Sequence, residues 1–310
     1  MTWKGRKVLV TGGAGFIGSR LVEELVRRRA SVTAADLCKP SEAKRLEGVA
    51  SKINILKCDV SEKKDLRKLD KKYDYIFHMA ALAYPKYCEE NPKLAFKNNI
   101  SGAFNIVNLA KNMKVKKIVF PSSAQLYGRY PRYFPIDERH PVEYENSVYN
   151  FTKKYGEDIL LLYGEKYNLP YVFFRLFNIF GPRQDRIYFL PTLITQALEK
   201  NVVELWSPKP TRDFTFVDDA INAFIRAAES KFVGGPINIG SNIELRVGDI
   251  AEKIADYLDV KIRFLNRDVS GSMRMRCNNE RAFEILHWKP KIQFENGLDR
   301  TLKWYEKKSL

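Results

Sequence analysis

The sequence lacks the features that mark several other classes of protein. No apolar run approaches the ~20 residues that a helix needs to span a bilayer, and no charged-then-apolar leader precedes the first predicted strand. The four cysteines show no CxxC or other metal-ligand spacing, and the 310 residues include only three histidines. We therefore expect no membrane partner, no bound metal and reduced thiols, as in a cytoplasmic protein.

Negative charge is scarce relative to positive charge. The chain has 53 Lys and Arg residues against 37 Asp and Glu, which gives a formal net charge of +16. The positive residues are scattered in short groups rather than gathered in one block. This pattern favours a solvated, Lys-rich surface over a nucleic-acid-binding surface, and attraction of anionic nucleotides is a third explanation.

A glycine-rich turn lies near the N-terminus, between a buried strand and a helix. Residues 8–10 form a continuous apolar run, typical of a parallel strand covered on both faces, and helical periodicity begins at Ser19. Glycines stand between them at positions 12, 13, 15 and 18. Glycine lets the backbone approach a pyrophosphate closely, and a helix N-terminus directs unpaired N–H groups at phosphates. The stretch predicts a dinucleotide-binding turn, although glycine-rich turns also serve simple geometry.

An acidic residue follows at the expected place. The second predicted strand ends at Asp36, eighteen residues after Gly18. A carboxylate there can accept hydrogen bonds from both hydroxyls of the adenosine ribose, and it would repel a 2′-phosphate. This favours NAD over NADP, although Lys39 and Arg45 lie close enough to weaken the preference. The alternative is a loop carboxylate in water.

The strand and helix pattern continues through the first 180 residues. Further strands are predicted at residues 53–56, 73–78, 117–121 and 171–177, and long helices at residues 96–113 and 148–167. After residue 180 the elements are shorter and irregularly spaced. We predict an α/β fold with a doubly wound, parallel, Rossmann-type sheet and a smaller interleaved α/β cap. The predicted domains are an NAD-binding domain at 1–180, to which segments near 213–240 could add, and a substrate-binding domain at 181–310.

A tyrosine, a lysine and a serine form a candidate catalytic set. Tyr149 and Lys153 are four residues apart in a predicted helix and share a face. An ammonium group within ~4–6 Å would lower the phenol pKa from about 10, and the same lysine can hold the nicotinamide ribose. Ser123, just after a predicted strand, can hydrogen-bond the reacting oxygen. A lone YxxxK is more often a surface pair, but downstream of a nucleotide-binding turn the set predicts proton and hydride transfer at an alcohol.

These motifs together carry a resemblance. In chain order they are TGGAGFIG, Asp36, CDV, HMAALA, NISG, SSAQLYG, YNFTK, RLFNIFGP and RDFTFVDDA. The chain is similar over nearly its full length to the extended short-chain dehydrogenase/reductase family, specifically to its nucleotide-sugar epimerases and dehydratases. The motifs are jointly very specific for this family and much less specific for the substrate.

The resemblance implies roles for particular residues. It implies cofactor contacts at Gly12, Gly15, Phe16, Ile17, Gly18, Asp36, Asp59, Val60, Ala80, Ala81, Asn99, Tyr149 and Lys153. It implies substrate contacts at Ser123, Gln125, Asn178, Arg212, Arg274 and Arg276. By this resemblance Asp59 and Val60 flank the adenine and Asn99 lines the cofactor channel. Arg212 would clamp the diphosphate. Either Arg274 or Arg276 would add a second cation, with a surface ion pair as the alternative for each. The resemblance also implies a homodimer through the helices at 96–113 and 148–167.

Departures from the family pattern narrow the reaction. The family's 4,6-dehydratases carry Thr-Asp-Glu where this chain has Ser123-Ala124-Gln125, and its decarboxylases usually keep a Glu at the last of these positions. Ala124 and Gln125 cannot supply the acid and base that elimination of water needs. What remains resembles the UDP-glucose/UDP-galactose 4-epimerase type, with Trp206-Ser-Pro-Lys-Pro-Thr-Arg212 replacing the usual Gly-Asp-Gly turn. The first alternative is a net reductase or dehydrogenase, a decarboxylase or a dehydratase acting on a nucleotide sugar. The second is a non-catalytic nucleotide- or nucleic-acid-binding protein.

Overall fold

The computed structural model describes residues 2–69, 72–268 and 271–309, which form two compact units. Unit 1 takes its residues from Met1–Leu126, Glu143–Arg175 and Ile221–Ile237. Unit 2 takes its residues from Tyr127–Val142, Leu176–Ala220 and Asn238–Leu310. The chain therefore passes repeatedly from one unit to the other.

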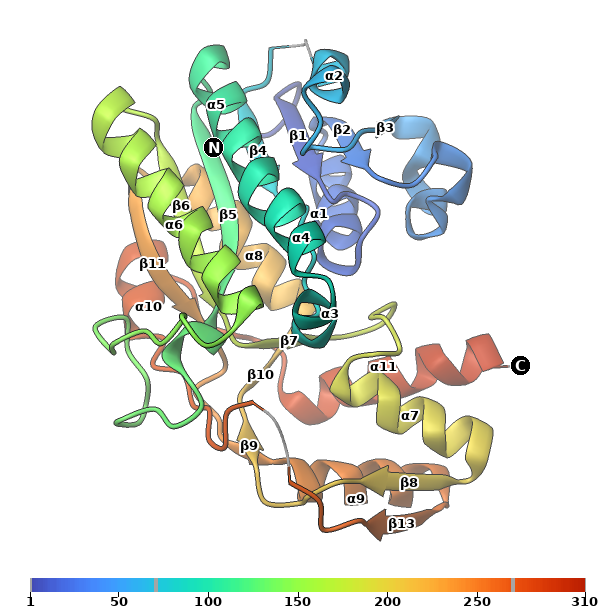
Figure 1. Cartoon of the computed structure of the whole chain (residues 1–310). Coiled ribbons are helices and arrows are strands. Elements are labelled where there is room, and N and C mark those ends of the chain that lie inside the picture. The colour runs from blue at the N-terminus through green and yellow to red at the C-terminus, as the bar shows by residue number, and fades with distance from the viewer. Residues whose placement is uncertain (1, 70–71, 269–270, 310) are drawn as a thin grey trace. The chain divides into compact units, whose positions relative to one another are not determined.

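Unit 1 is built on a sheet of seven strands in the described part of the chain, in the order β11-β6-β5-β4-β1-β2-β3 (Figure 1). The strands are β1 Lys7–Thr11, β2 Ser31–Asp36, β3 Asn54–Lys57, β4 Tyr75–His78, β5 Lys117–Ser123, β6 Tyr171–Leu176 and β11 Gly234–Ile239. The pairs among β3, β2, β1, β4 and β5 are parallel. The chain moves outward from β1 in both directions, which confirms the predicted doubly wound Rossmann-type sheet.

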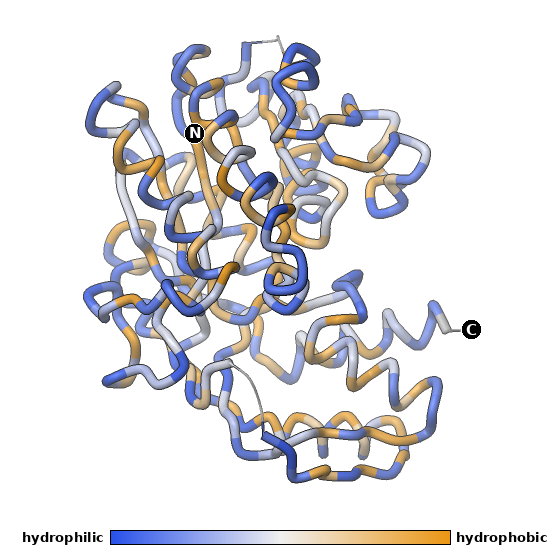
Figure 2. Tube along the Cα trace, in the orientation of Figure 1, coloured by the Kyte–Doolittle hydropathy of each residue, from blue (hydrophilic) through white to orange (hydrophobic). Residues whose placement is uncertain are grey.

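Helices cover both faces of this sheet. Helices α5 Gly102–Met113 and α6 Val148–Tyr167 lie in front of the sheet in Figure 1, and α1 Phe16–Arg27 lies behind it. Figure 2 shows hydrophilic and hydrophobic residues alternating along α5 and α6, as expected for helices with one buried face. The three residues of the predicted apolar run at 8–10 are fully buried, as a strand covered on both faces requires.

The long helices follow the predictions with one difference. The helix predicted at 148–167 has those bounds, whereas the one predicted at 96–113 begins with a π-helical segment, η4 Phe96–Ser101, before α5. Gly156 allows α6 to approach β5, because a Cβ at this position would lie 2.5 Å from Phe120 Cζ. The shorter helices of unit 1 are η1 Pro40–Glu42, η2 Lys44–Lys52, α2 Lys63–Leu66, η3 Arg67–Leu69, α3 Pro85–Glu90, α4 Pro92–Ala95 and η5 Ala124–Tyr127.

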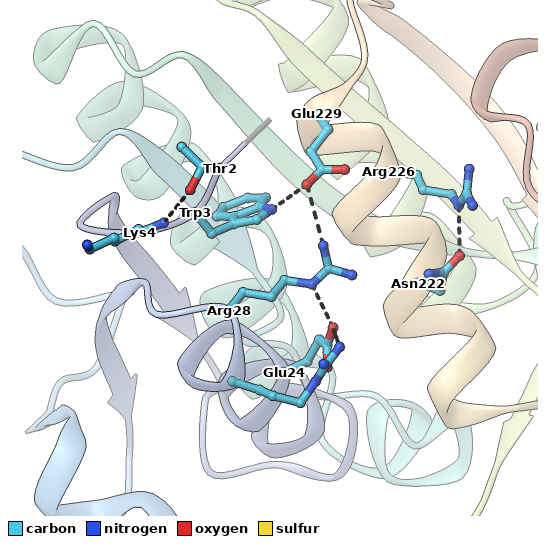
Figure 3. Close-up of polar contacts among 9 residues, drawn as sticks. Thr2, Trp3, Lys4, Glu24, Arg28, Asn222, Arg226 and Glu229 are labelled. Carbon is cyan, nitrogen blue, oxygen red and sulfur yellow. Dashed lines mark hydrogen bonds and ion pairs between the residues drawn. The ribbon is translucent and has the colours of Figure 1, made fainter.

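The segment 221–237 joins unit 1 through buried and partly buried polar contacts. It includes most of helix α8 Val217–Glu229, whose last residue accepts a hydrogen bond from Trp3 Nε1 (2.5 Å) and pairs with Arg28 (3.5 Å; Figure 3). Lys117 Nζ donates to the carbonyl oxygens of Ala227 (3.0 Å) and Ser230 (2.6 Å) at the end of this helix. A cation at a helix C-terminus satisfies carbonyl groups that have no partner inside the helix.

Unit 2 contains short strand pairs with helices around them. The pairs are β7 Asn178–Phe180 with β10 Phe214–Phe216, β8 Val202–Leu205 with β13 Lys261–Phe264, and β9 Thr211–Arg212 with β12 Leu245–Arg246. The helices are α7 Phe189–Lys200, α9 Val247–Leu258, α10 Glu280–Leu286 and α11 Phe294–Ser309. Phe180 and Phe214 pack edge to face with ring centroids 5.9 Å apart, and Phe294 lies within 5.5 Å of both rings. These rings form part of the apolar core of the unit.

The described residues also bear on membranes and cysteine chemistry. Among them, no helix has both the length and the apolar character that crossing a membrane requires. Cys58, Cys88 and Cys277 are buried free thiols, and Cys38 is a partly exposed one.

Candidate active site

The glycine-rich turn packs its backbone too closely for side chains. Gly12 has a φ of +64°, and a Cβ there would lie 2.6 Å from the backbone nitrogen of Ala80. A Cβ on Gly18 would lie 2.0 Å from the carbonyl oxygen of Gly12. Gly15 immediately precedes α1, whose first residues are Phe16 and Ile17. Within the described residues no side chain caps the backbone N–H groups at this end of the helix. The turn can therefore present open backbone donors to a phosphate.

Asp36 lies at the end of β2, beside this turn. Its Oδ2 accepts a hydrogen bond from the backbone nitrogen of Ala14 (2.9 Å), and its Oδ1 accepts a long one from Cys38 (3.5 Å). The carboxylate is partly exposed. It both holds the glycine-rich turn and keeps accepting capacity for ribose hydroxyls.

The next strands end at the same edge of the sheet. Asp59 follows β3 and accepts hydrogen bonds from both the nitrogen (2.9 Å) and the hydroxyl (2.6 Å) of Ser61. The neighbouring Val60 is buried and packs against α5. A Cβ added at Gly102 of that helix would lie only 2.9 Å from Val60 Cγ2. Ala80, just after β4, donates its backbone N–H to the hydroxyl of Thr11 (3.3 Å). In a doubly wound sheet this edge is where ligands bind.

Asn99 connects the loop after β4 to helix α6. Its Oδ1 accepts from the nitrogen of Leu82 (2.7 Å), and its Nδ2 donates to the Leu82 oxygen (3.1 Å) and to Thr152 Oγ1 (2.9 Å). Thr152 in turn donates to the carbonyl oxygen of Tyr149 (2.9 Å). These contacts fix the loop that carries Ala80 and Ala81 relative to the helix that carries the candidate base.

Ser123, Tyr149 and Lys153 come together in unit 1, as the sequence predicts. Ser123 is the last residue of β5, and its hydroxyl is near enough to the phenol of Tyr149 to lower the pKa of that group. Lys153 is one turn further along α6, and its Nζ donates to the carbonyl oxygen of Pro121 (2.9 Å) and lies 5.2 Å from the ring centroid of Phe120. All three side chains are buried. The arrangement places a hydroxyl, a phenol and an ammonium where a proton can be transferred.

The structure does not show the expected lowering of the Tyr149 pKa by Lys153. Burial raises the pKa of Tyr149 to about 12, against the smaller effect of its hydrogen bond with Ser123. Burial also lowers the pKa of Lys153 to about 8, because the ammonium is removed from water, with Cys88 and Glu157 opposing the change. Burial is thus the main cause of the pKa shift of both groups, and Lys153 is not among the causes for Tyr149.

Positions 124 and 125, where the resemblance implies that the dehydratases and decarboxylases differ from the epimerases, carry no ionisable group. Ala124 is 1% exposed and has only a methyl side chain. Gln125 is exposed, and its backbone contacts Ser123 Oγ through the nitrogen (3.2 Å) and Asn150 Nδ2 through the oxygen (3.0 Å). Neither position therefore supplies a carboxylate next to Ser123.

The other predicted substrate residues belong to unit 2. Arg212 Nη1 donates to the carbonyl oxygen of Ser272 (2.6 Å), and burial lowers the pKa of Arg212 to about 10. Arg274 makes two hydrogen bonds to Glu244, both of 2.8 Å. Arg276 Nε donates to Asn242 Oδ1 (3.1 Å). Arg274 therefore has the ion-pair arrangement that the sequence left as its alternative.

The sequence of the chain is similar to those of known proteins. Residues 8–240 match the profile of the NAD dependent epimerase/dehydratase family. The chain belongs to this family. It is 30% identical to the UDP-N-acetyl-alpha-D-glucosaminuronate decarboxylase of Bacillus cytotoxicus, over 97% of this chain and 98% of that protein. It is also 30% identical to the UDP-glucose 4-epimerase of Mycolicibacterium smegmatis, over 98% and 99%.

A solved structure supports the same family. The UDP-N-acetylglucosamine 4-epimerase of Methanobrevibacter ruminantium, in complex with UDP-N-acetylmuramic acid, is similar with a TM-score of 0.91 and 30% identity, covering 98% of this chain and 99% of that one. Family membership shows an enzyme of the NAD-dependent nucleotide-sugar epimerase/dehydratase type and confirms the predicted NAD cofactor. Because the relatives include both epimerases and a decarboxylase, this chain's own residues must decide between the reactions.

The structure adds residues of this family member that the sequence analysis missed. Glu89, from α3, accepts hydrogen bonds from Ser147 Oγ (3.0 Å) and from the Val148 nitrogen (2.9 Å), so it caps the N-terminus of the helix that carries Tyr149. Cys88 packs against Tyr149 in one apolar cluster. No local pattern could identify Glu89, because it lies 58 residues before its partner Ser147. Among the described residues, no three His, Cys, Asp or Glu side chains are placed to hold a metal.

Proposed function

We propose that the protein epimerises a nucleoside-diphosphate sugar at C4, in the manner of UDP-glucose/UDP-galactose 4-epimerases. The observation that supports this most directly is the complete set of Ser123, Tyr149 and Lys153 beside two positions without an acid or base, Ala124 and Gln125. Oxidation and reduction at one carbon need only proton transfer and a hydride acceptor. Elimination of water needs two further ionisable groups.

The residues of unit 1 account for the proton transfers. In the forward half-reaction, Tyr149 as phenolate accepts the proton of the sugar 4-hydroxyl while the C4 hydrogen leaves as hydride, so that C4 becomes a ketone. Ser123 hydrogen-bonds the reacting oxygen and stabilises it while the proton is transferred. In the return half-reaction the hydride reaches the other face of C4, and Tyr149 returns the proton. The sugar would undergo no net oxidation, so no NADH would accumulate.

We propose that the bound cofactor lowers the high pKa of Tyr149. NAD in its oxidised form supplies the hydride acceptor and a positive charge, and a nearby positive charge favours a phenolate over a phenol. Lys153 Nζ donates to the carbonyl oxygen of Pro121 (2.9 Å), and we propose that the same ammonium would hold the nicotinamide ribose. We propose that the glycine-rich turn and Asp36 hold the dinucleotide, and that Asp59, Val60, Ala80 and Ala81 also contact it. Asn99 would fix the loop that carries Ala80 and Ala81.

Unit 2 is proposed to hold the nucleotide sugar. Arg212 is the main candidate for the diphosphate, because a guanidinium is permanently charged and donates in a fork. Asn178 and Arg276 are proposed as further contacts. Arg274 is the weakest candidate, because Glu244 already occupies its guanidinium with two hydrogen bonds.

Decarboxylation is the second candidate, because a relative 30% identical over nearly the whole chain is named as a decarboxylase. The family's decarboxylases usually carry a Glu where Gln125 stands, and this argues against it. A net dehydrogenase would form NADH in proportion to product. A non-catalytic binding protein would not require the buried set of Ser123, Tyr149 and Lys153.

The proposed reaction is tested by incubating the purified protein with UDP-glucose, UDP-galactose and their N-acetyl forms. Proton NMR follows the sugar, and absorbance follows NADH in the same sample. We expect interconversion of the C4 epimers without net NADH. Stoichiometric NADH would indicate a dehydrogenase, and loss of carbon dioxide from UDP-glucuronate would indicate a decarboxylase.

We also propose a homodimer that forms through α5 and α6. Large apolar side chains are exposed on this pair of helices, including Phe104 (46%), Tyr155 (43%) and Leu162 (56%). Leu162→Glu should convert the dimer to a monomer in sedimentation velocity, because it places a charge in an apolar contact. The control is Ile187→Glu, which changes an equally exposed residue (53%) in unit 2 and should leave the dimer intact. A monomeric wild type, or a dimeric Leu162→Glu variant, would contradict the proposal.

A further inference from the structure

Asp213 is a fully buried carboxylate that lies between β9 and β10 in unit 2. Its Oδ1 accepts hydrogen bonds from the nitrogen (2.6 Å) and the hydroxyl (2.8 Å) of Ser241, and its Oδ2 accepts from the nitrogens of Asn242 (2.9 Å) and Cys277 (3.0 Å). Four donors come close to filling the accepting capacity of an ionised carboxylate. The side chain thereby joins two segments that are far apart in the sequence.

The proposed substrate residues are attached to this junction. Arg212 is the residue before Asp213. Asn178 donates both its backbone nitrogen (3.0 Å) and its Nδ2 (3.1 Å) to the carbonyl oxygen of Asp213. Arg276 is the residue before Cys277, and its Nε bonds to Asn242 Oδ1 (3.1 Å). Three of the four proposed substrate contacts in unit 2 thus share one buried anchor.

The packing around the anchor leaves little room for adjustment. A Cβ on Gly240 would lie 2.2 Å from Cys277 Cβ and 3.2 Å from Asp213 Oδ2. Interiors packed this closely transmit a displacement rather than absorb it. A weakened junction would therefore move the attached side chains as well.

We infer that Asp213 is a positioning residue for the nucleotide site, and that it sets the affinity for a nucleoside diphosphate through Asn178, Arg212 and Arg276 without contacting the ligand. This inference rests on the proposed role of unit 2 in binding a nucleotide sugar. A carboxylate suits the role because it can accept all four hydrogen bonds at once, whereas an amide cannot.

The test is Asp213→Asn, assayed by calorimetric titration with UDP, GDP and dTDP and, separately, with NAD. In either orientation the amide NH2 faces backbone donors, so the junction loosens. We expect the dissociation constant of the tightest-binding nucleoside diphosphate to rise on the order of 10-fold, the size seen when a supporting partner of a binding group is lost. The dissociation constant of NAD should not change, because the glycine-rich turn belongs to unit 1.

Asp219→Asn is the matched control. Asp219 is also buried (4%), and its Oδ2 accepts from the backbone nitrogens of Lys291 (3.0 Å) and Ile292 (2.9 Å). Burial raises the pKa of both carboxyl groups, that of Asp213 to about 6. The control should therefore lose stability in a similar way while keeping its affinity for the nucleoside diphosphate.

Several outcomes would overturn the inference. They are an unchanged affinity in Asp213→Asn, an equal loss in Asp219→Asn, a parallel loss of NAD affinity, and a wild type that binds none of the three nucleotides. If Asp213→Asn does not fold, Ser241→Ala removes only the hydroxyl donor, and it should weaken the nucleotide about 3-fold, as loss of one hydrogen bond predicts. An unchanged nucleotide affinity in Ser241→Ala would also overturn the inference. Specific loss of UDP affinity in a protein without epimerase activity would support Asp213 while contradicting the proposed reaction.

Discussion

Tyr149→Phe should lower kcat by about 10³-fold, the middle of the range for loss of a general acid–base. The substitution removes only the phenolic oxygen, which is the atom that exchanges a proton with the sugar hydroxyl in the proposed reaction. Binding of NAD should remain, because the glycine-rich turn, Asp36 and Lys153 are unchanged. Turnover of the nucleotide sugar and calorimetric titration with NAD measure the two effects separately.

Tyr163→Phe is the control for this substitution. Tyr163 is a buried tyrosine on the same helix (8% exposed), where it packs edge to face with Phe104, 6.1 Å away. It should keep near-normal kcat. Normal turnover by Tyr149→Phe would show that another group is the base, and equal losses in the two variants would point to a packing defect.

The largest effect on stability is expected for Glu157→Gln. Glu157 and Arg175 form a buried pair with hydrogen bonds of 3.0 and 2.8 Å, and their side chains are 2% and 6% exposed. Removing one charge of a buried, hydrogen-bonded pair costs about 3–5 kcal/mol. Because the pair joins α6 to β6, urea denaturation should show a lower free energy of unfolding for the variant.

The control for this pair is Glu295→Gln. Glu295 pairs with Lys253 at 2.7 Å, but the two side chains are 59% and 49% exposed. Exposed pairs of this kind contribute less than about 1 kcal/mol. Similar losses of stability in the two variants would contradict the assigned importance of burial.

The sequence predicted those parts of the fold and site whose signals are local. The helix at 148–167 was predictable because its apolar residues and its catalytic pair share one helical period. The turn at 12–18 was predictable because only glycine tolerates the close approach seen between Gly18 and Gly12. The parallel sheet followed from the alternation of apolar strands with helices.

Other features depend on contacts between distant residues and carry no local signal. Strand β11 was missed because it begins Gly-Gly-Pro and has the polar Asn238 between two isoleucines. The pKa of Tyr149 depends on burial by the assembled core, which spacing along a helix does not report. The hydrogen bonds of Asp213 reach residues 28 to 64 positions away. Such partners are brought together only by the tertiary fold.

The most direct test of the proposed mechanism is to follow a hydrogen isotope through the reaction. The substrate is the nucleotide sugar that turns over, prepared with deuterium at C4, and proton and deuterium NMR follow it in ordinary water. The account predicts the C4 epimer with deuterium retained at C4 and no accumulation of NADH, because the hydride that leaves C4 returns to C4. Loss of deuterium to water, or its stoichiometric recovery in NADH, would contradict epimerisation through a transient 4-keto sugar.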